Sequence, residues 1–310
     1  MKLREAWASS RQRLESADIP DASLEAEVLL RHTLSINRAT FFASLEHEPS
    51  VSDANSFERF VERRIVGEPL AYITGHREFY GLDFVVTPDV LVPRQETEML
   101  VEAVLQFAKG RLTPSPFKEE GWGEDGGDLT IADIGTGSGA IAIALGHSLP
   151  DAIVNATDIS PDALRVADTN RRKHGVEDRV HIQQGDLFDA LDGPMDVIVS
   201  NPPYLSSKEV GVLPSDVQHE PMTALSAGLD GMDVLRRLIE STPSYLNPGG
   251  LLVVEIDPRR FDSVMALTAA VFDDSELSLV RDHAGLPRMV TVSLSKNAAH
   301  SITPVRPTLP

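Results

Sequence analysis

The segment VSNPPYL, residues 199–205, has residue types that suit recognition of a planar nitrogen carrying two hydrogens. Two prolines stiffen the turn and remove two backbone N–H donors. The backbone carbonyls, such as that of Pro202, and the side-chain oxygen of Asn201 are then left to accept hydrogen bonds. The ring of Tyr204 offers a face to a planar group. Such a site would hold an amide or an aromatic amine and turn its nitrogen toward a methyl donor. The alternative is a rigid turn after a strand.

A second run, IADIGTGSGAIAIAL at residues 131–145, predicts a strand, a glycine-rich loop and a helix that together bind a nucleoside. Glycines allow a tight turn and a close approach of the backbone to a ligand, and the helix N-terminus presents free N–H groups. Asp158 follows at the end of the next strand, where a carboxylate can bind both hydroxyls of a ribose. The alternative is a glycine turn without a ligand. The loop residues assigned to the ligand are Gly135, Thr136, Gly137, Ser138 and Gly139.

The choice of nucleoside depends on the acid in front of the loop. Gly135, Gly137 and Ala140 also fit the dinucleotide-binding fingerprint. The carboxylate of Asp133, however, would repel a pyrophosphate and attract a sulfonium or amino group. This favours S-adenosylmethionine over NAD, with a loop-capping acid as the alternative. Asp186, within QQGDLF, is assigned to the adenine amino group, with an ordinary turn aspartate as the alternative.

The elements that must position these residues alternate between strand and helix from residue 129 onward. This alternation predicts an α/β fold with a doubly wound sheet. A late antiparallel hairpin is expected at the sheet edge, from 277–282 and 288–294. The expected strands are 129–134, 152–157, 179–184, 195–200 and 251–256, and the expected helices are 139–149, 160–173, 230–246 and 261–272.

The N-terminal part has a different pattern. Residues 1–74 indicate a helical domain, in which Ser52 or Asp53 caps one helix, and residues 75–92 indicate a hairpin that links two domains. Pro93 is expected to begin a helix with Glu96 and Glu98 in its first turn. The main domain then covers 93–296, with a solvated loop at 112–128 and a disordered tail at 297–310.

Composition limits the classes of function. The 310 residues include 28 basic and 47 acidic side chains, a net charge of 28 − 47 = −19, and no cysteine. Disulfides, thiolate metal sites and cysteine nucleophiles are therefore excluded. The acidity argues against a broad cationic surface for nucleic acid. The nine histidines lack ligand spacing, so no metal is expected. The chain has no apolar run long enough for a membrane span, and a cytoplasmic, monomeric enzyme that binds no membrane is the expectation.

The Asn-Pro-Pro-Tyr run together with the glycine loop resembles methyltransferases that act on planar amino groups, on adenine in nucleic acids or on glutamine in proteins. Residues 67–102, GEPLAYITGHREFYGLDFVVTPDVLVPRQETEMLVE, are similar to the release factor glutamine methyltransferase family (HemK/PrmC). The resemblance extends to about residue 295. It implies a Rossmann-like, S-adenosylmethionine-dependent methyltransferase sheet and an N-terminal helical bundle that helps to hold the release factor.

This resemblance also implies a reaction in translation termination, which is methylation of the amide nitrogen of the glutamine in the Gly-Gly-Gln motif of class 1 peptide chain release factors. Leu187 stands where some members place an aromatic ring over the adenine, and Glu255 is a candidate orienter or a structural residue. The alternatives are an adenine methyltransferase acting on nucleic acid and a non-catalytic nucleoside-binding protein. The residues implied in substrate binding are Arg94, Glu96, Asn201, Pro202, Pro203 and Tyr204.

Overall fold

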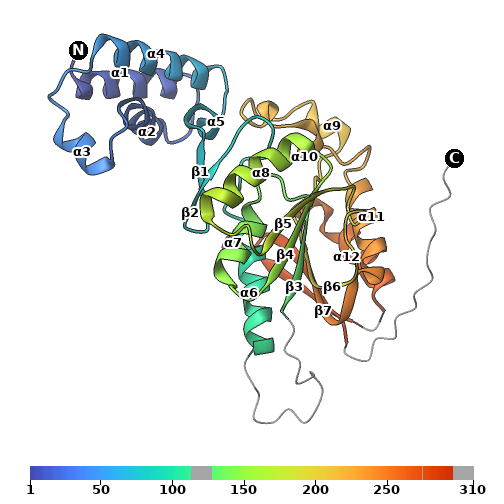
Figure 1. The fold of residues 1–310 in the computed structure, drawn as a ribbon. Helices are drawn as coiled ribbons and strands as arrows, with labels where there is room; N and C mark the ends of the chain where they lie inside the picture. Colours follow the sequence, from blue (N-terminus) through green and yellow to red (C-terminus); the bar gives the residue numbers. More distant parts are fainter. Residues whose placement is uncertain (113–127, 274, 296–310) are drawn as a thin grey trace. The chain divides into compact units, whose positions relative to one another are not determined.

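The computed structural model describes residues 1–112, 128–273 and 275–295 (Figure 1). The interior of the expected 112–128 loop and the expected tail at 297–310 lie outside these ranges. The described chain forms two compact units. One contains residues 1–76, 86–88 and 213–220, and the other contains the remaining described residues. No described helix is both long and apolar enough to cross a membrane.

The first unit is helical, as the N-terminal pattern predicts. Leu14, Leu29 and Phe41 are fully buried in its core. The expected cap at residues 52–53 is wrong, because the side chain of Ser50 accepts the N–H of Asp53 and caps the helix two residues earlier. The helices in this part of the chain are α1 (Leu3–Ser16), α2 (Ala22–Leu34), α3 (Arg38–Ala43), α4 (Val51–Ile65) and α5 (Leu70–Thr74), and the 3₁₀ turn η1 (Val217–His219) belongs to the same unit.

A short hairpin follows, with strands β1 (His76–Phe79) and β2 (Leu82–Val85). The buried amide of Asn170 holds this hairpin in place within the second unit. The Asn170 oxygen accepts the N–H of Val85 at 2.7 Å, and its nitrogen donates to the carbonyls of Val85 and Ser138, both at 2.9 Å. One side chain therefore joins the hairpin to the glycine loop.

The second unit contains a seven-stranded sheet in the order β5-β4-β3-β6-β7-β9-β8. The five strands from β5 to β7 are parallel, and β9 and β8 form the antiparallel edge hairpin that the sequence predicts. From β3 the chain continues to β4 and β5 on one side, and from β6 it continues to β7 on the other side. The strand order therefore reverses between β3 and β6, and this topological switch point is where such folds bind ligands. The strands are β3 (Thr130–Ile134), β4 (Ile153–Asp158), β5 (Val180–Gln184), β6 (Met195–Ser200), β7 (Leu246–Glu255), β8 (Glu276–Arg281) and β9 (Pro287–Ser293).

Helices cover both faces of this sheet, as Figure 1 shows. One apolar core packs α6 and α7 on one face, and a second packs α11 and α12 on the other. The α/β fold class is thereby confirmed. The helices of this unit are α6 (Glu98–Leu112), α7 (Ala140–Ser148), α8 (Pro161–His174), α9 (Ser207–Val210), α10 (Met222–Leu225), α11 (Asp233–Ser241) and α12 (Phe261–Val271), with the 3₁₀ turns η2 (Thr242–Ser244) and η3 (Pro258–Arg260).

Two helix boundaries differ from the prediction. The helix expected to begin at Pro93 begins at Glu98, because residues 94–97 form successive turns with i to i+3 hydrogen bonds. The helix expected over 230–246 ends at Ser241, where the chain tightens into a 3₁₀ turn that contains Pro243. The first difference matters for the site, because it places Thr97 in a buried turn beside it.

Candidate active site

The glycine loop joins β3 to α7 at the carboxyl edge of the sheet. Gly135, Gly137 and Gly139 all have positive φ, at 75°, 56° and 81°. A Cβ at Gly139 would also lie 2.8 Å from the Cδ1 atom of Ile143, whereas Gly135 and Gly137 have open space on that side. Backbone conformation therefore requires all three glycines, and helix packing requires only the last of them.

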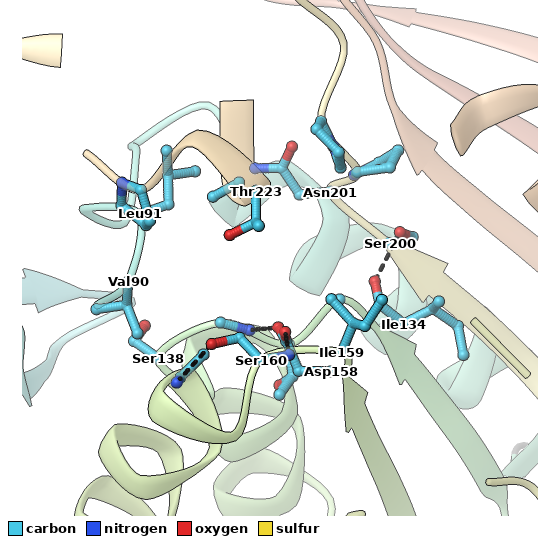
Figure 2. A pocket seen from close by; sticks show the side chains of 18 of the residues that line it. Val90, Leu91, Ile134, Ser138, Asp158, Ile159, Ser160, Ser200, Asn201 and Thr223 are labelled. Carbon is cyan, nitrogen blue, oxygen red and sulfur yellow. Dashed lines mark hydrogen bonds between the residues drawn. The ribbon is translucent and has the colours of Figure 1, made fainter. Parts of the chain in front are cut away.

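This loop forms one wall of a cavity of about 340 Å³. Figure 2 shows Ser138, Asp158 and Ser160 on one side of the cavity and Asn201 and Thr223 on the other. The predicted residues that line it are Arg94, Gly135, Thr136, Gly137, Ser138, Asp158, Asp186, Leu187, Asn201, Pro202 and Pro203. Four other predicted residues, Asp133, Gly139, Glu96 and Tyr204, do not line it.

Asp158 is held firmly at the end of β4. Its carboxylate accepts the N–H groups of Gly137 and Ser160, both at 2.9 Å (Figure 2). Burial raises the pKa of Asp158, and these backbone hydrogen bonds act in the opposite direction. A carboxylate has about four acceptor positions. The side chain lines the cavity, so the acceptor positions that these N–H groups leave open could bind ribose hydroxyls, which is the role predicted for it.

Asp133 lies behind the loop and is fully buried. Its Oδ2 atom accepts the Thr136 hydroxyl at 2.6 Å and the N–H of Ala142 at 3.1 Å, while Oδ1 has no hydrogen-bond partner among the described residues. Burial raises the pKa of this carboxyl to about 7. These two hydrogen bonds hold the loop in shape, as the alternative of a loop-capping acid requires, and the attraction of a sulfonium by Asp133 stays a prediction.

The other wall begins where β6 ends. The Ser200 hydroxyl donates to the Ile134 carbonyl at 2.7 Å and joins β6 to β3, and the following Asn201 lies across the cavity from Ser138 and Asp158 (Figure 2). Tyr204 lies farther along, in partial contact with the core under α11 and α12. Burial, together with the nearby carboxylates of Glu255 and Asp257, raises its pKa to about 12. Tyr204 does not line the cavity, and the predicted packing of its ring on a planar substrate group stays a prediction.

Asn201 has partners that the sequence did not indicate. Its Nδ2 atom donates to the Thr97 hydroxyl oxygen at 3.1 Å, and that hydroxyl donates to Oε2 of Glu255 at 2.7 Å. Thr97 and Glu255 are 4% and 5% exposed. Burial raises the pKa of Glu255 to about 7. Glu255 was a candidate orienter, and the structure brings it within one side chain of Asn201.

Only one of the other two residues predicted to bind the substrate, Arg94 and Glu96, lines the cavity. Arg94 lines the cavity, whereas Glu96 lies outside it with its carboxylate 3.9 Å from a guanidinium nitrogen of Arg288. The change follows from the late start of α6, which leaves Glu96 in a turn instead of a helix.

Both residues predicted to contact the adenine, Asp186 and Leu187, line the cavity. Asp186 accepts the Arg237 guanidinium at 2.8 Å. Leu187 has a positive φ of 53°, and its carbonyl accepts the Thr157 hydroxyl at 3.0 Å. Lining residues that sequence reasoning missed are Asp89, Val90, Leu91, Thr97, Thr223 and Arg237. They come from loops and single positions that carry no repeated spacing.

Together, the switch-point cavity, the glycine loop and the strand-end Asp158 define a methyltransferase of the Rossmann-like, S-adenosylmethionine-dependent class. Comparison with known proteins is consistent with this class. The PrmC N-terminal domain family matches residues 5–75, and the methyltransferase small domain family matches residues 124–218.

Curated relatives narrow the class to a family. The chain is 44% identical to the release factor glutamine methyltransferase of Moorella thermoacetica, over 93% of this chain and 97% of that protein. It is 38% identical to the protein of the same name from Koribacter versatilis, over 94% and 98%. The chain belongs to the release factor glutamine methyltransferase family.

Solved structures agree on the fold. The catalytic domain of hMettl16, solved in complex with the MAT2A 3′UTR hairpin 6, superimposes with a TM-score of 0.54 and 15% identity. The match covers 81% of this chain and 84% of that one. At this identity the likeness establishes a shared fold only.

Proposed function

We propose that this protein methylates the side-chain amide nitrogen of the glutamine in the Gly-Gly-Gln motif of class 1 peptide chain release factors. The methyl donor of this family is S-adenosylmethionine. The observation that carries the proposal is the placement of Asn201 across the cavity from the glycine loop. Its amide NH₂ group already donates a hydrogen bond to the Thr97 hydroxyl. Its Oδ1 atom is then the end of the side chain that can accept a substrate N–H.

The cavity fits the donor. A volume of about 340 Å³ is in the range of small-molecule sites. Asp158 would hold the ribose hydroxyls, Asp186 would accept the adenine amino group, and the side chain of Leu187 would cover the ring. The backbone of the glycine loop would lie against the amino-acid part. When bound, S-adenosylmethionine supplies an electrophilic methyl group on a positively charged sulfur.

The substrate amide needs positioning more than activation by a strong base. Its nitrogen is a poor nucleophile because the lone pair is conjugated with the carbonyl. The Oδ1 atom of Asn201 and the carbonyl of Pro202 would accept the two N–H groups and turn the lone pair toward the methyl group. Favourable orientation can contribute roughly 7–11 kcal/mol at its upper end. Transfer would break the bond between the methyl carbon and sulfur and leave S-adenosylhomocysteine as the second product. The proton on the nitrogen becomes acidic as the C–N bond forms and would pass to water, so no general base is assigned.

Charge disfavours the alternative of an adenine methyltransferase on nucleic acid. The net charge is −19, and the residues after the N-terminal 74 carry 19 basic and 35 acidic side chains. A protein that binds a phosphate backbone instead concentrates lysine and arginine on one face.

We assign recognition of the intact release factor to the N-terminal helical unit. A hollow in this unit is lined by Trp7, Leu24, Arg38 and Phe42. Leu24 and Phe42 are 49% and 44% exposed, which is unusual for large apolar side chains in one place. A monomer that acts in the cytoplasm and binds neither membrane nor nucleic acid completes the proposal.

A transfer assay with isotopically labelled donor tests this function. The purified protein is incubated with a class 1 release factor, with the same factor carrying Gly-Gly-Ala in place of Gly-Gly-Gln, or with DNA and RNA. We expect label only in the Gly-Gly-Gln factor, located by mass spectrometry on the glutamine. Label in nucleic acid, or equal label in both factors, would contradict the proposal.

A further inference from the structure

Two buried side chains behind Asn201 take no direct part in the proposed chemistry. Thr97 comes from the turn before α6 and Glu255 from the last position of β7. The parallel pairing of β6 with β7 sets Ser200 opposite Val254, which brings Asn201, the residue after β6, close to Glu255, the last residue of β7. The result is a chain of two hydrogen bonds, from Asn201 to Thr97 and from Thr97 to Glu255, of 3.1 and 2.7 Å.

The negative charge of Glu255 determines the donor and the acceptor in both of these hydrogen bonds. An ionised carboxylate can only accept, so the hydrogen of the Thr97 hydroxyl must point to Glu255. The hydroxyl oxygen is then available only as an acceptor on its other side. Asn201 must present its NH₂ group there and not its carbonyl oxygen. The Oδ1 atom is thereby turned away from Thr97 and becomes the acceptor for a substrate.

We propose that Glu255 and Thr97 are positioning residues that fix the Asn201 amide with its oxygen toward the substrate nitrogen. This inference rests on the proposed function, because an acceptor is needed only if the substrate nitrogen carries hydrogens. A free asparagine amide has two orientations that differ by a 180° flip and are close in energy. The relay selects the productive one.

Protonation of Glu255 allows both hydrogen bonds to reverse direction. A neutral carboxyl can donate to the Thr97 oxygen, and the Thr97 hydrogen can then point to Asn201, which would have to turn its oxygen inward. Two N–H donors would face each other at the substrate. Methyl transfer should therefore rise with pH as Glu255 ionises and fall below that range.

The surroundings of Glu255 determine the pH at which it ionises. Burial raises its pKa to about 7, the neighbouring carboxylate of Glu96 raises it as well, and Arg288 and Arg94 lower it. Tyr204 is neutral here because its own pKa is raised to about 12. The carboxyl of Asp133 also has a pKa raised to about 7, so a pH profile of the parent enzyme alone cannot assign the transition.

Variants of the relay separate these contributions. Thr97→Val keeps the shape but removes the hydroxyl, and we expect kcat to fall about tenfold, the value of one hydrogen bond of roughly 1.4 kcal/mol. Thr97→Ser should recover most of the rate. Thr268→Val is the matched control, because Thr268 is equally buried and its hydroxyl donates to the Val264 carbonyl within α12, outside the cavity. If Thr97→Val lowers kcat no more than Thr268→Val, the proposal is overturned.

A second readout does not require activity. The side-chain amide of Asn201, observed by ¹⁵N NMR in the free full-length protein, should shift with a midpoint near the raised pKa of Glu255. In Glu255→Gln this transition should disappear, together with the corresponding limb of the kcat profile. A transition that persists in Glu255→Gln belongs to another group, such as Asp133, and would overturn the proposal. Failure of the parent to methylate a release factor would instead refute the proposed function and leave the NMR result to decide on the relay.

Discussion

Replacement of Asp158 by alanine should weaken binding of the methyl donor without unfolding the protein. Asp158 lines the cavity and accepts two backbone N–H groups at 2.9 Å, so its orientation is fixed before any ligand arrives. A hydrogen bond to a charged group contributes about 1.5–3 kcal/mol, and about 1.4 kcal/mol corresponds to tenfold in affinity. The dissociation constant for the donor should therefore rise by about 10- to 150-fold.

Isothermal titration calorimetry with S-adenosylmethionine measures this change directly. Asp178→Ala is the control, because Asp178 is exposed and pairs with Arg179. It precedes β5 and therefore lies at the amino ends of the parallel strands, whereas Asp158 lies at their carboxyl ends. Burial raises the pKa of Asp158, so donor binding in the parent should also weaken as pH falls and this carboxylate is protonated. If the affinity of Asp158→Ala equals that of Asp178→Ala, the ribose assignment is refuted.

Three further outcomes are expected. Gly139→Ala should lower the melting temperature more than Gly135→Ala, because both have positive φ but only the first would place a Cβ against Ile143, at 2.8 Å; equal losses would contradict the packing argument. Asn170→Ala should lower the free energy of unfolding, measured in urea, by about 2–3 kcal/mol, because it leaves the Val85 N–H and the Ser138 carbonyl without their hydrogen-bond partner. A decrease below about 0.5 kcal/mol would show that these groups find other partners. Exchange of the exposed Leu24 and Phe42 for serine should raise KM for the intact release factor and leave donor affinity unchanged, whereas equal effects on both would refute a docking role.

Much of the fold follows from the sequence because alternating strands and helices leave few arrangements. Parallel strands joined by helices place their carboxyl ends at one edge of the sheet, and Asp158 and Asn201 were both assigned to strand ends. The structure brings both to one cavity. The antiparallel edge hairpin likewise follows from the short turn between its strands.

The details that sequence reasoning missed depend on side-chain direction and distant partners. Asp133 and Tyr204 have the residue types for ligand contact, but neither lines the cavity, and spacing along the chain does not determine which way each points. Thr97 is a single threonine whose partner Glu255 is 158 residues away. Pro93 matches a helix-start preference, yet the chain first turns to bury Thr97.

The rate of glutamine methylation by Asn201→Ala tests the central claim most directly. The oxygen of Asn201 is proposed to act mainly in the transition state, so its loss should lower kcat by about 10²–10³, or roughly 2.7–4 kcal/mol, with donor affinity nearly unchanged. The assay follows methyl transfer to a Gly-Gly-Gln release factor at saturating donor, with calorimetry of donor binding on the same preparation. Transfer at the parent rate would contradict the account.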